Sequence, residues 1–119
     1  MRSDKNVYWV IQLAIHEGQG DAFRALADEM CAATANEAGA LNYEWNLSED
    51  GKTCHVLERY ADSDGVRAHN ENIAAFVERL VAIADVAAVE VYGSPDDGAR
   101  KILEGFGAKF NRPYAGFVR

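Results

Sequence analysis

The sequence has 119 residues, about the length of one domain, and is 49% hydrophobic and 26% charged, a balance typical of globular proteins. Its net charge of −7 argues against non-specific binding to nucleic acid or to an anionic membrane surface. No apolar run approaches the roughly 20 residues that cross a bilayer. No apolar segment follows the charged residues at the start, so we expect no signal peptide and a cytoplasmic location.

Cysteine and histidine spacing gives no sign of a metal centre. Cys31 and Cys54 form no CxxC pair, and His16, His55 and His69 make no ligand spacing with one another. We therefore expect no metal site and no disulfide framework, and we expect both cysteines to be buried as small hydrophobic side chains.

The first predicted strand is Val7–Ile15, with five alternate apolar residues on one face. The other face carries Tyr8, Val10, Gln12 and Ala14, so neither face is strongly polar. A sheet that is apolar on both faces is covered on both faces. A chain this small has helices for one face only, so we expect the other face to meet a second subunit.

A helix is predicted over residues 21–38, with Asp21 as its N-cap and Gly39 as the glycine that ends it. The apolar residues that would face the sheet recur at helical spacing. They are Phe23, Leu26, Met30 and Ala33.

Two strands follow, Ala40–Leu47 and Thr53–Tyr60, joined by a hairpin loop with Asp50-Gly51 at its tight turn. Alternation places four residues of the second strand on one face. These are Cys54, Val56, Glu58 and Tyr60.

Glu58 thus lies on a strand face that otherwise carries apolar residues. Its carboxylate is therefore expected either to be paired or to have a raised pKa. Tyr43 and Trp45 share a face of the preceding strand. The register of the hairpin decides whether that is the face of Glu58, because a slip of one residue reverses the answer.

An amphipathic helix is predicted over residues 62–84, capped by Asp62 or Ser63. One member of its inward stripe, His69, is a titratable side chain where an aliphatic one would be expected. The stripe comprises Val66, His69, Ile73, Phe76, Leu80 and Ile83.

A fourth strand over residues 86–92 completes the order β-α-β-β-α-β, the split βαβ pattern of an α+β, ferredoxin-like fold. The remaining residues, 93–119, are expected to form a C-terminal helix and arm attached to this core of residues 7–92. We expect residues 1–119 to be a single domain.

Within the C-terminal part, Ser94 and Pro95 are typical of the N-cap and first position of a helix. Pro113 makes the last residues an edge strand or an extended arm. Their aromatic side chains need a surface to cover them, and a partner subunit is expected to provide it. These side chains are Phe110, Tyr114 and Phe117.

Four stretches of the chain together resemble the antibiotic biosynthesis monooxygenase family, over roughly residues 7–92. The pattern is G-x-L-x-Y-E, a hairpin, a strand that ends E-R-Y-x-D, and A-H on the next helix. The stretches are residues 39–45 (GALNYEW), 48–51 (SEDG), 56–63 (VLERYADS) and 68–69 (AH).

This resemblance implies a dimeric α+β barrel, in which two ferredoxin-like units stack sheet against sheet, and a pocket between sheet and helices in each subunit. It implies a homodimer held by sheet-to-sheet packing and by the C-terminal arm. Family members include cofactor-free oxygenases of aromatic hydroquinones, haem-degrading enzymes and proteins with no known activity. The haem-degrading branch carries an asparagine within its first strand, whereas here Asn6 precedes the strand, which disfavours haem.

From the resemblance we expect a monooxygenase that oxidises a small phenol or hydroquinone with molecular oxygen and no cofactor. Such chemistry needs a base with a pKa near neutrality, an apolar cavity that excludes water, and a donor that orients the substrate oxygen. His69 is a candidate base or donor, with Glu58 and Asn72 as its catalytic partners. The side chains expected to bind the substrate are Tyr60, Val56, Val66, Trp45 and Tyr43.

Structural roles for the same residues remain open. His69 is equally compatible with a core histidine whose ring nitrogens are both satisfied, and Asn72 with a residue that faces solvent. The alternative function is a non-catalytic dimer that binds a small ligand or acts in a stress response. Haem binding through His69 is a third possibility.

Overall fold

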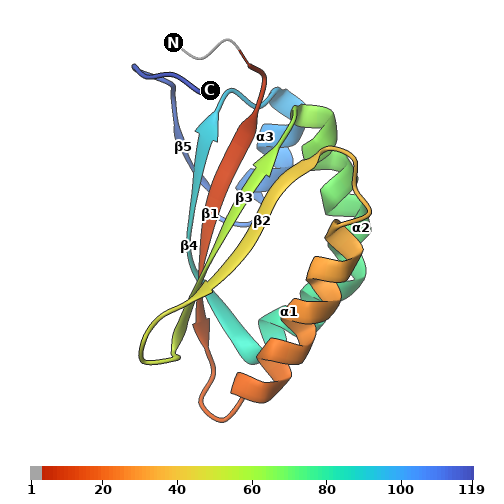
Figure 1. Cartoon of the computed structure of the whole chain (residues 1–119), viewed down its shortest axis with the longest axis vertical. Coiled ribbons are helices and arrows are strands. Elements are labelled where there is room, and N and C mark those ends of the chain that lie inside the picture. The colour runs from red at the N-terminus through yellow and green to blue at the C-terminus, as the bar shows by residue number, and fades with distance from the viewer. Residues whose placement is uncertain (1–3) are drawn as a thin grey trace.

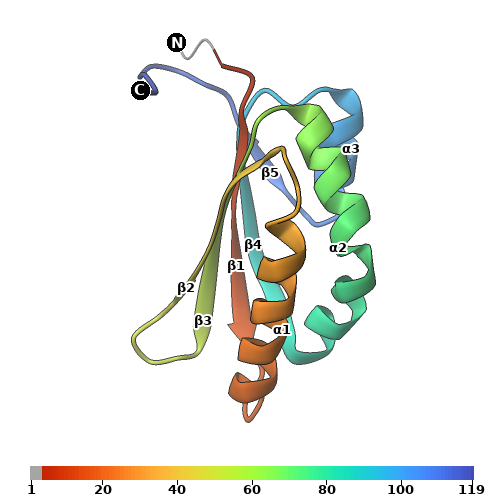
Figure 2. The ribbon, with the colours of Figure 1, turned by 45° about the vertical axis from the view of Figure 1, so that its right-hand side comes forward.

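The computed structural model describes residues 4–119. Three helices lie against one face of a single sheet, and the opposite face has no helix over it in the described chain (Figures 1 and 2). The strands are β1 (Val7–Ile15), β2 (Ala40–Leu47), β3 (Thr53–Tyr60), β4 (Ala84–Gly93) and β5 (Lys109–Asn111). The helices are α1 (Gly20–Thr34), α2 (Ser63–Ile83) and α3 (Asp97–Glu104).

The sheet order is β2-β3-β1-β4-β5. The central strand β1 pairs antiparallel with β3 and β4, and β5 is added parallel to β4 at the edge. The first four strands with α1 and α2 therefore form the ferredoxin-like α+β fold, which confirms the predicted fold class. No helix in the described part of the chain is both long and apolar enough to span a membrane.

The predicted extent of the first helix was wrong at both ends. α1 begins at Gly20 with Gln19 at the N-cap, and it ends at Thr34 rather than residue 38. Gly39 is not a helix-ending glycine, because it lies well beyond Thr34 in the following turn. A Cβ at Gly39 would lie 3.1 Å from the Cα of Gly65, so a glycine is required there by the close approach of two backbones.

The other predicted helix and strand boundaries lie closer to the observed ones. Asp62 caps α2 by accepting a 2.9 Å hydrogen bond from the backbone of Gly65, as predicted. The predicted Ser94 cap was wrong: Asp96 caps α3, accepting from the backbone of Ala99 at 2.9 Å. The fourth strand starts two residues earlier than predicted because α2 turns into it directly at Ala84.

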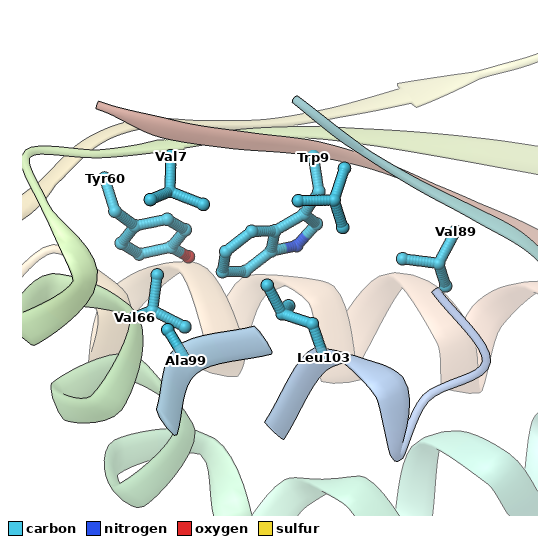
Figure 3. Close-up of a cluster of buried hydrophobic side chains, with 8 residues drawn as sticks. Val7, Trp9, Tyr60, Val66, Val89, Ala99 and Leu103 are labelled. Carbon is cyan, nitrogen blue, oxygen red and sulfur yellow. The ribbon is translucent and has the colours of Figure 1, made fainter. Parts of the chain in front are cut away.

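The core lies between the sheet and the helices. Figure 3 shows Val7 and Trp9 of β1 and Tyr60 of β3 packing toward Val66 of α2 and Leu103 of α3. Trp9 and Tyr60 stack with ring centroids 4.5 Å apart. This cluster fixes the positions of α2 and α3 relative to the sheet, and hence the shape of the space between them.

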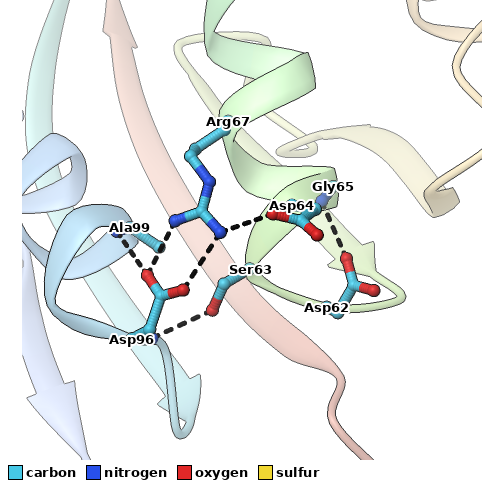
Figure 4. A network of polar contacts seen from close by, with 7 residues as sticks. All are labelled: Asp62, Ser63, Asp64, Gly65, Arg67, Asp96 and Ala99. Atoms are coloured by element: carbon cyan, nitrogen blue, oxygen red, sulfur yellow. Dashed lines mark hydrogen bonds and ion pairs between the residues drawn. The ribbon is translucent and has the colours of Figure 1, made fainter.

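The start of α3 is tied to the start of α2 by a polar network (Figure 4). The Arg67 guanidinium donates to both carboxylate oxygens of Asp96, at 2.8 and 3.0 Å, and also to Asp64. Ser63 accepts a hydrogen bond of 2.9 Å from the backbone N–H of Asp96. A bidentate guanidinium–carboxylate pair fixes orientation as well as distance, so α3 is held in register with α2.

Candidate functional site

A cavity of about 90 Å³ lies between the sheet and the helices α2 and α3. A water molecule needs roughly 10–15 Å³ of such space, so the cavity has room for a small organic compound. Most of its lining is aliphatic or aromatic, and Glu58, His69 and Asn70 supply its polar side chains. An apolar cavity with a few convergent polar groups is the usual form of a small-molecule site.

His69 lies between two carboxylates at one end of this cavity. Its Nδ1 is 2.9 Å from Oε2 of Glu37, and its Nε2 is 3.3 Å from Oε1 of Glu58. The side chains of His69, Glu37 and Glu58 are 7%, 7% and 4% exposed, so the whole group is screened from water. Because both ring nitrogens face a carboxylate, neither is free to bind a haem iron.

The two carboxylates set the charge of His69. Burial by itself would lower the pKa of the imidazole, but hydrogen bonding and charge attraction from Glu58 and then Glu37 outweigh it, so the pKa lies above the ordinary value of 6.5. The two carboxylates therefore favour the protonated, positively charged form of His69, and the group Glu37–His69–Glu58 is an imidazole held between two buried carboxylates.

Three aromatic rings enclose the imidazole. The ring centroids of Tyr60, Tyr43 and Trp9 lie 4.9, 5.3 and 6.2 Å from that of His69. The Tyr60 hydroxyl donates a 2.7 Å hydrogen bond to Oε1 of Glu58. Burial, and then the charge of Glu58, raise the pKa of both tyrosines, so both hydroxyls stay protonated.

Glu37 is a site residue that the sequence analysis missed. It follows the end of α1, in a turn where its backbone N–H donates to Thr34 and its carbonyl accepts from Ala40. Since the helix was predicted to run through residue 38, Glu37 was treated as one more helical position. Its place in the turn lets its carboxylate reach His69 on the neighbouring helix.

Asn72 contacts the Glu37 carboxylate from outside the cavity. Its Nδ2 donates to Oε2 of Glu37 at 2.7 Å and to the carbonyl of Ala33 at 2.9 Å. It does not line the cavity, and neither does Tyr60, which is fully buried behind Glu58. Both residues therefore lie next to the polar group and orient its carboxylates.

The register of the β2–β3 hairpin settles which face of β2 meets the site. Tyr43 pairs with Glu58 and Trp45 with Val56, so these four side chains share the face toward the helices. All four line the cavity, as does Val66. Alternation alone left the face undecided because a slip of one residue in the hairpin register would have reversed it.

Trp45 adds a weakly satisfied hydrogen-bond donor to the wall. Its buried Nε1 makes no hydrogen bond of good geometry with the described residues and interacts only loosely with the Tyr43 hydroxyl. A buried N–H without an acceptor costs about 1–3 kcal/mol, and a ligand oxygen in the cavity is one group that removes this cost. Within residues 4–119, no cluster of three histidine, cysteine or acidic side chains is arranged to hold a metal ion.

The arrangement is suited to moving protons in an apolar space. Glu58 at the cavity wall can accept a proton, and the charged His69 next to it can donate one. The low polarity around them strengthens both interactions with a bound molecule.

Comparison with known proteins agrees with this architecture. MupZ from Pseudomonas fluorescens has a similar structure, with a TM-score of 0.88 and 25% identity over 98% of this chain and 96% of that one. The protein SO0527 from Shewanella oneidensis has a TM-score of 0.67 and 23% identity, over 77% and 93% of the two chains. SnoaB, a cofactor-independent oxygenase from Streptomyces nogalater whose structure is that of a mutant, has a TM-score of 0.63 and 17% identity, over 73% and 88%.

A search of curated protein sequences found no match. The model of the antibiotic biosynthesis monooxygenase family matches residues 6–79, which include β1, α1, β2, β3 and most of α2, and therefore every member of the Glu37–His69–Glu58 group. The chain belongs to the antibiotic biosynthesis monooxygenase family.

Proposed function

We propose that this protein is a cofactor-independent monooxygenase that oxidises a small phenol or hydroquinone with molecular oxygen. The observation that carries the proposal is the Glu37–His69–Glu58 group, buried at the wall of an apolar cavity. Oxygen in its triplet ground state reacts slowly with closed-shell molecules, and converting a phenol into its electron-rich anion overcomes this. The site has a base for that step and excludes water around it.

The reaction balances with these residues alone. Glu58 accepts the phenolic proton, and the phenolate gives one electron to O2. The phenoxyl radical and superoxide combine at a ring carbon that bears hydrogen, para to the oxygen in a phenol and ortho to it in a hydroquinone. The peroxide anion takes a proton from protonated His69, which regains it from Glu58. Loss of the proton from that ring carbon to Glu58, with cleavage of the O–O bond, releases hydroxide. His69 protonates this hydroxide to water and regains its proton from Glu58, and a quinone remains.

The donors around the cavity support binding of the substrate oxygen close to this base. Tyr60 holds Glu58 in place, and the buried N–H of Trp45 lies in the cavity wall without a hydrogen bond of good geometry to the described residues. Tyr43, Val56 and Val66 supply apolar lining for the ring.

An oxygen electrode tests the proposal. With phenols and hydroquinones of one ring, in buffer containing a metal chelator, we expect one O2 to be consumed for each quinone formed. Binding without turnover of any such compound would instead support the alternative, a ligand-binding protein.

A second candidate function is a proton-transfer reaction that needs no oxygen, such as an isomerisation or an elimination. The specific observation in its favour is that the site holds an acid and a base side by side, a charged His69 next to Glu58. Substrate consumption at equal rates under nitrogen and under air would favour this function over oxygenation.

We also propose that the chain forms a homodimer through the sheet face that no helix covers in the described chain, with the C-terminal arm packed on the partner. Leu57 and Tyr92 on this face are 41% and 40% exposed, and in the arm Tyr114 and Phe117 are 96% and 73% exposed. Val10 of β1 pairs with Leu57, which gives the centre of the face an apolar pair, with Glu44 and Glu90 on its two sides. Burial of such a surface favours association.

Sedimentation of a Leu57→Asp variant tests the dimer. A charge at the centre of the face is expected to convert the dimer to a monomer, whereas Ala74→Asp on the exposed side of α2 should leave it dimeric. A wild-type protein that sediments as a monomer at micromolar concentration would contradict the proposal.

A further inference from the structure

The cavity is elongated along α2. Its lining includes residues of this helix from Val66 near the first turn to Val81 near the last. From residue 69 to residue 81, an α-helix that rises about 1.5 Å per residue advances about 18 Å. The space beside the helix is therefore long compared with a single aromatic ring, which needs only the end near His69.

Polarity changes along this length. Glu58, His69 and Asn70 all lie toward one end, and the lining residues that follow Ile73 in the sequence are aliphatic except for Phe106. At the far end the cavity opens to solvent, because its lining residues Val81, Val86 and Phe106 are 50%, 39% and 37% exposed. Three exposed apolar side chains from three separate segments thus form a rim, an arrangement that is typical of ligand entrances.

The apolar half is built partly by a segment outside the family match. Ile102 and Leu103 of α3 and Phe106 after it line the cavity, whereas the family model ends at residue 79. The match to MupZ covers 98% of this chain, while the matches to SO0527 and SnoaB cover 77% and 73%. The Arg67–Asp96 pair fixes α3 at this place (Figure 4), so the apolar wall is preformed.

We propose that the substrate is an elongated amphiphile, a phenol or hydroquinone that carries an unbranched alkyl tail. The polar ring lies against Glu58 and His69, and the tail runs along α2 and leaves between Val81, Val86 and Phe106. This inference rests on the proposed function for the identity of the ring. The tail is assigned from the length, the apolar lining and the open rim of the cavity.

Binding of a homologous series tests the tail. We would titrate the protein with 3-alkylphenols of increasing chain length by calorimetry under nitrogen, where no oxygenation occurs. Each methylene buried in the apolar half is expected to tighten binding about fourfold. The gain should stop once the tail has passed the rim, because further methylenes remain in water.

A charge at the rim should shorten this gain. In Val81→Asp the increase in affinity with chain length is expected to stop at a shorter chain than in the wild type, because the methylenes that reach the rim there meet a charge. Ala82→Asp is the matched control, because Ala82 is exposed on the same helix and does not line the cavity. It should keep the full dependence on chain length.

These binding experiments test the alkyl tail independently of the oxygenation reaction. Affinity that is independent of chain length, or tighter binding of compact polycyclic phenols than of alkylphenols, overturns the tail even if one-ring phenols are oxidised. Affinity that increases with chain length, and that levels off at a shorter chain in Val81→Asp, supports the tail, even if the oxygen electrode records no uptake and the oxygenase function fails.

Discussion

Replacing His69 with alanine is expected to lower the turnover of a phenol by about 10²–10⁴-fold, the usual contribution of a positioned acid or base. The variant loses the acid that protonates the peroxide and the departing hydroxide. It also leaves Glu37 and Glu58 buried without the positive charge between them. Removing one partner of a buried charge pair costs about 3–5 kcal/mol of unfolding free energy.

Two further variants separate catalysis from folding. His69→Gln keeps a hydrogen-bond donor near the carboxylates but has no acid, so it should fold better than the alanine variant and still lose turnover. His16→Ala is the matched control, because His16 also pairs with a carboxylate, Asp85 at 2.9 Å, but on the surface. Circular dichroism checks folding, and wild-type turnover in folded His69→Gln would remove His69 from the mechanism.

Replacing Glu58 with glutamine is expected to abolish turnover to a similar extent and to move the pH range in which the protein loses stability. The carboxylates raise the pKa of His69 above the 6.5 it has when unfolded. A raised pKa of a basic group contributes stability that is complete below the unfolded pKa and is lost as the pH rises through the folded pKa. Within that window the unfolding free energy should fall by up to about 1.4 kcal/mol per pH unit.

Glu58 is one of the two carboxylates that raise this pKa. In Glu58→Gln the fall in stability should therefore begin at a lower pH than in the wild type, with Glu37 still in place. Urea unfolding at intervals between about pH 6 and 9 measures the effect. The His69→Gln variant should show a smaller fall over this range, because only the surface His16, whose pKa Asp85 also raises, then contributes. A wild-type fall no larger than that of the variant would mean that His69 carries no charge in the folded protein.

The order of the elements followed from local patterns because these patterns reflect which face of each element is buried. Alternation in Val7–Ile15 and helical spacing from Val66 to Ile83 each identified an element and its inward side. Helix ends were predicted less well, since a cap depends on backbone geometry that several neighbouring residues could supply. Asp62 was identified, but Gln19 and Asp96 were not.

The sequence by itself determined the family, the ferredoxin-like fold, and that His69 and Glu58 point inward, because each of these depends on local periodicity or on a motif. Only the tertiary structure decided that Glu37 completes the charged group, since its carboxylate reaches His69 across 32 positions of sequence from a turn. The hairpin register decided that Tyr43 and Trp45 share the site. The packing of α3 on α2 and the sheet gave the cavity its length, because a cavity is formed between elements and leaves no pattern within any one of them.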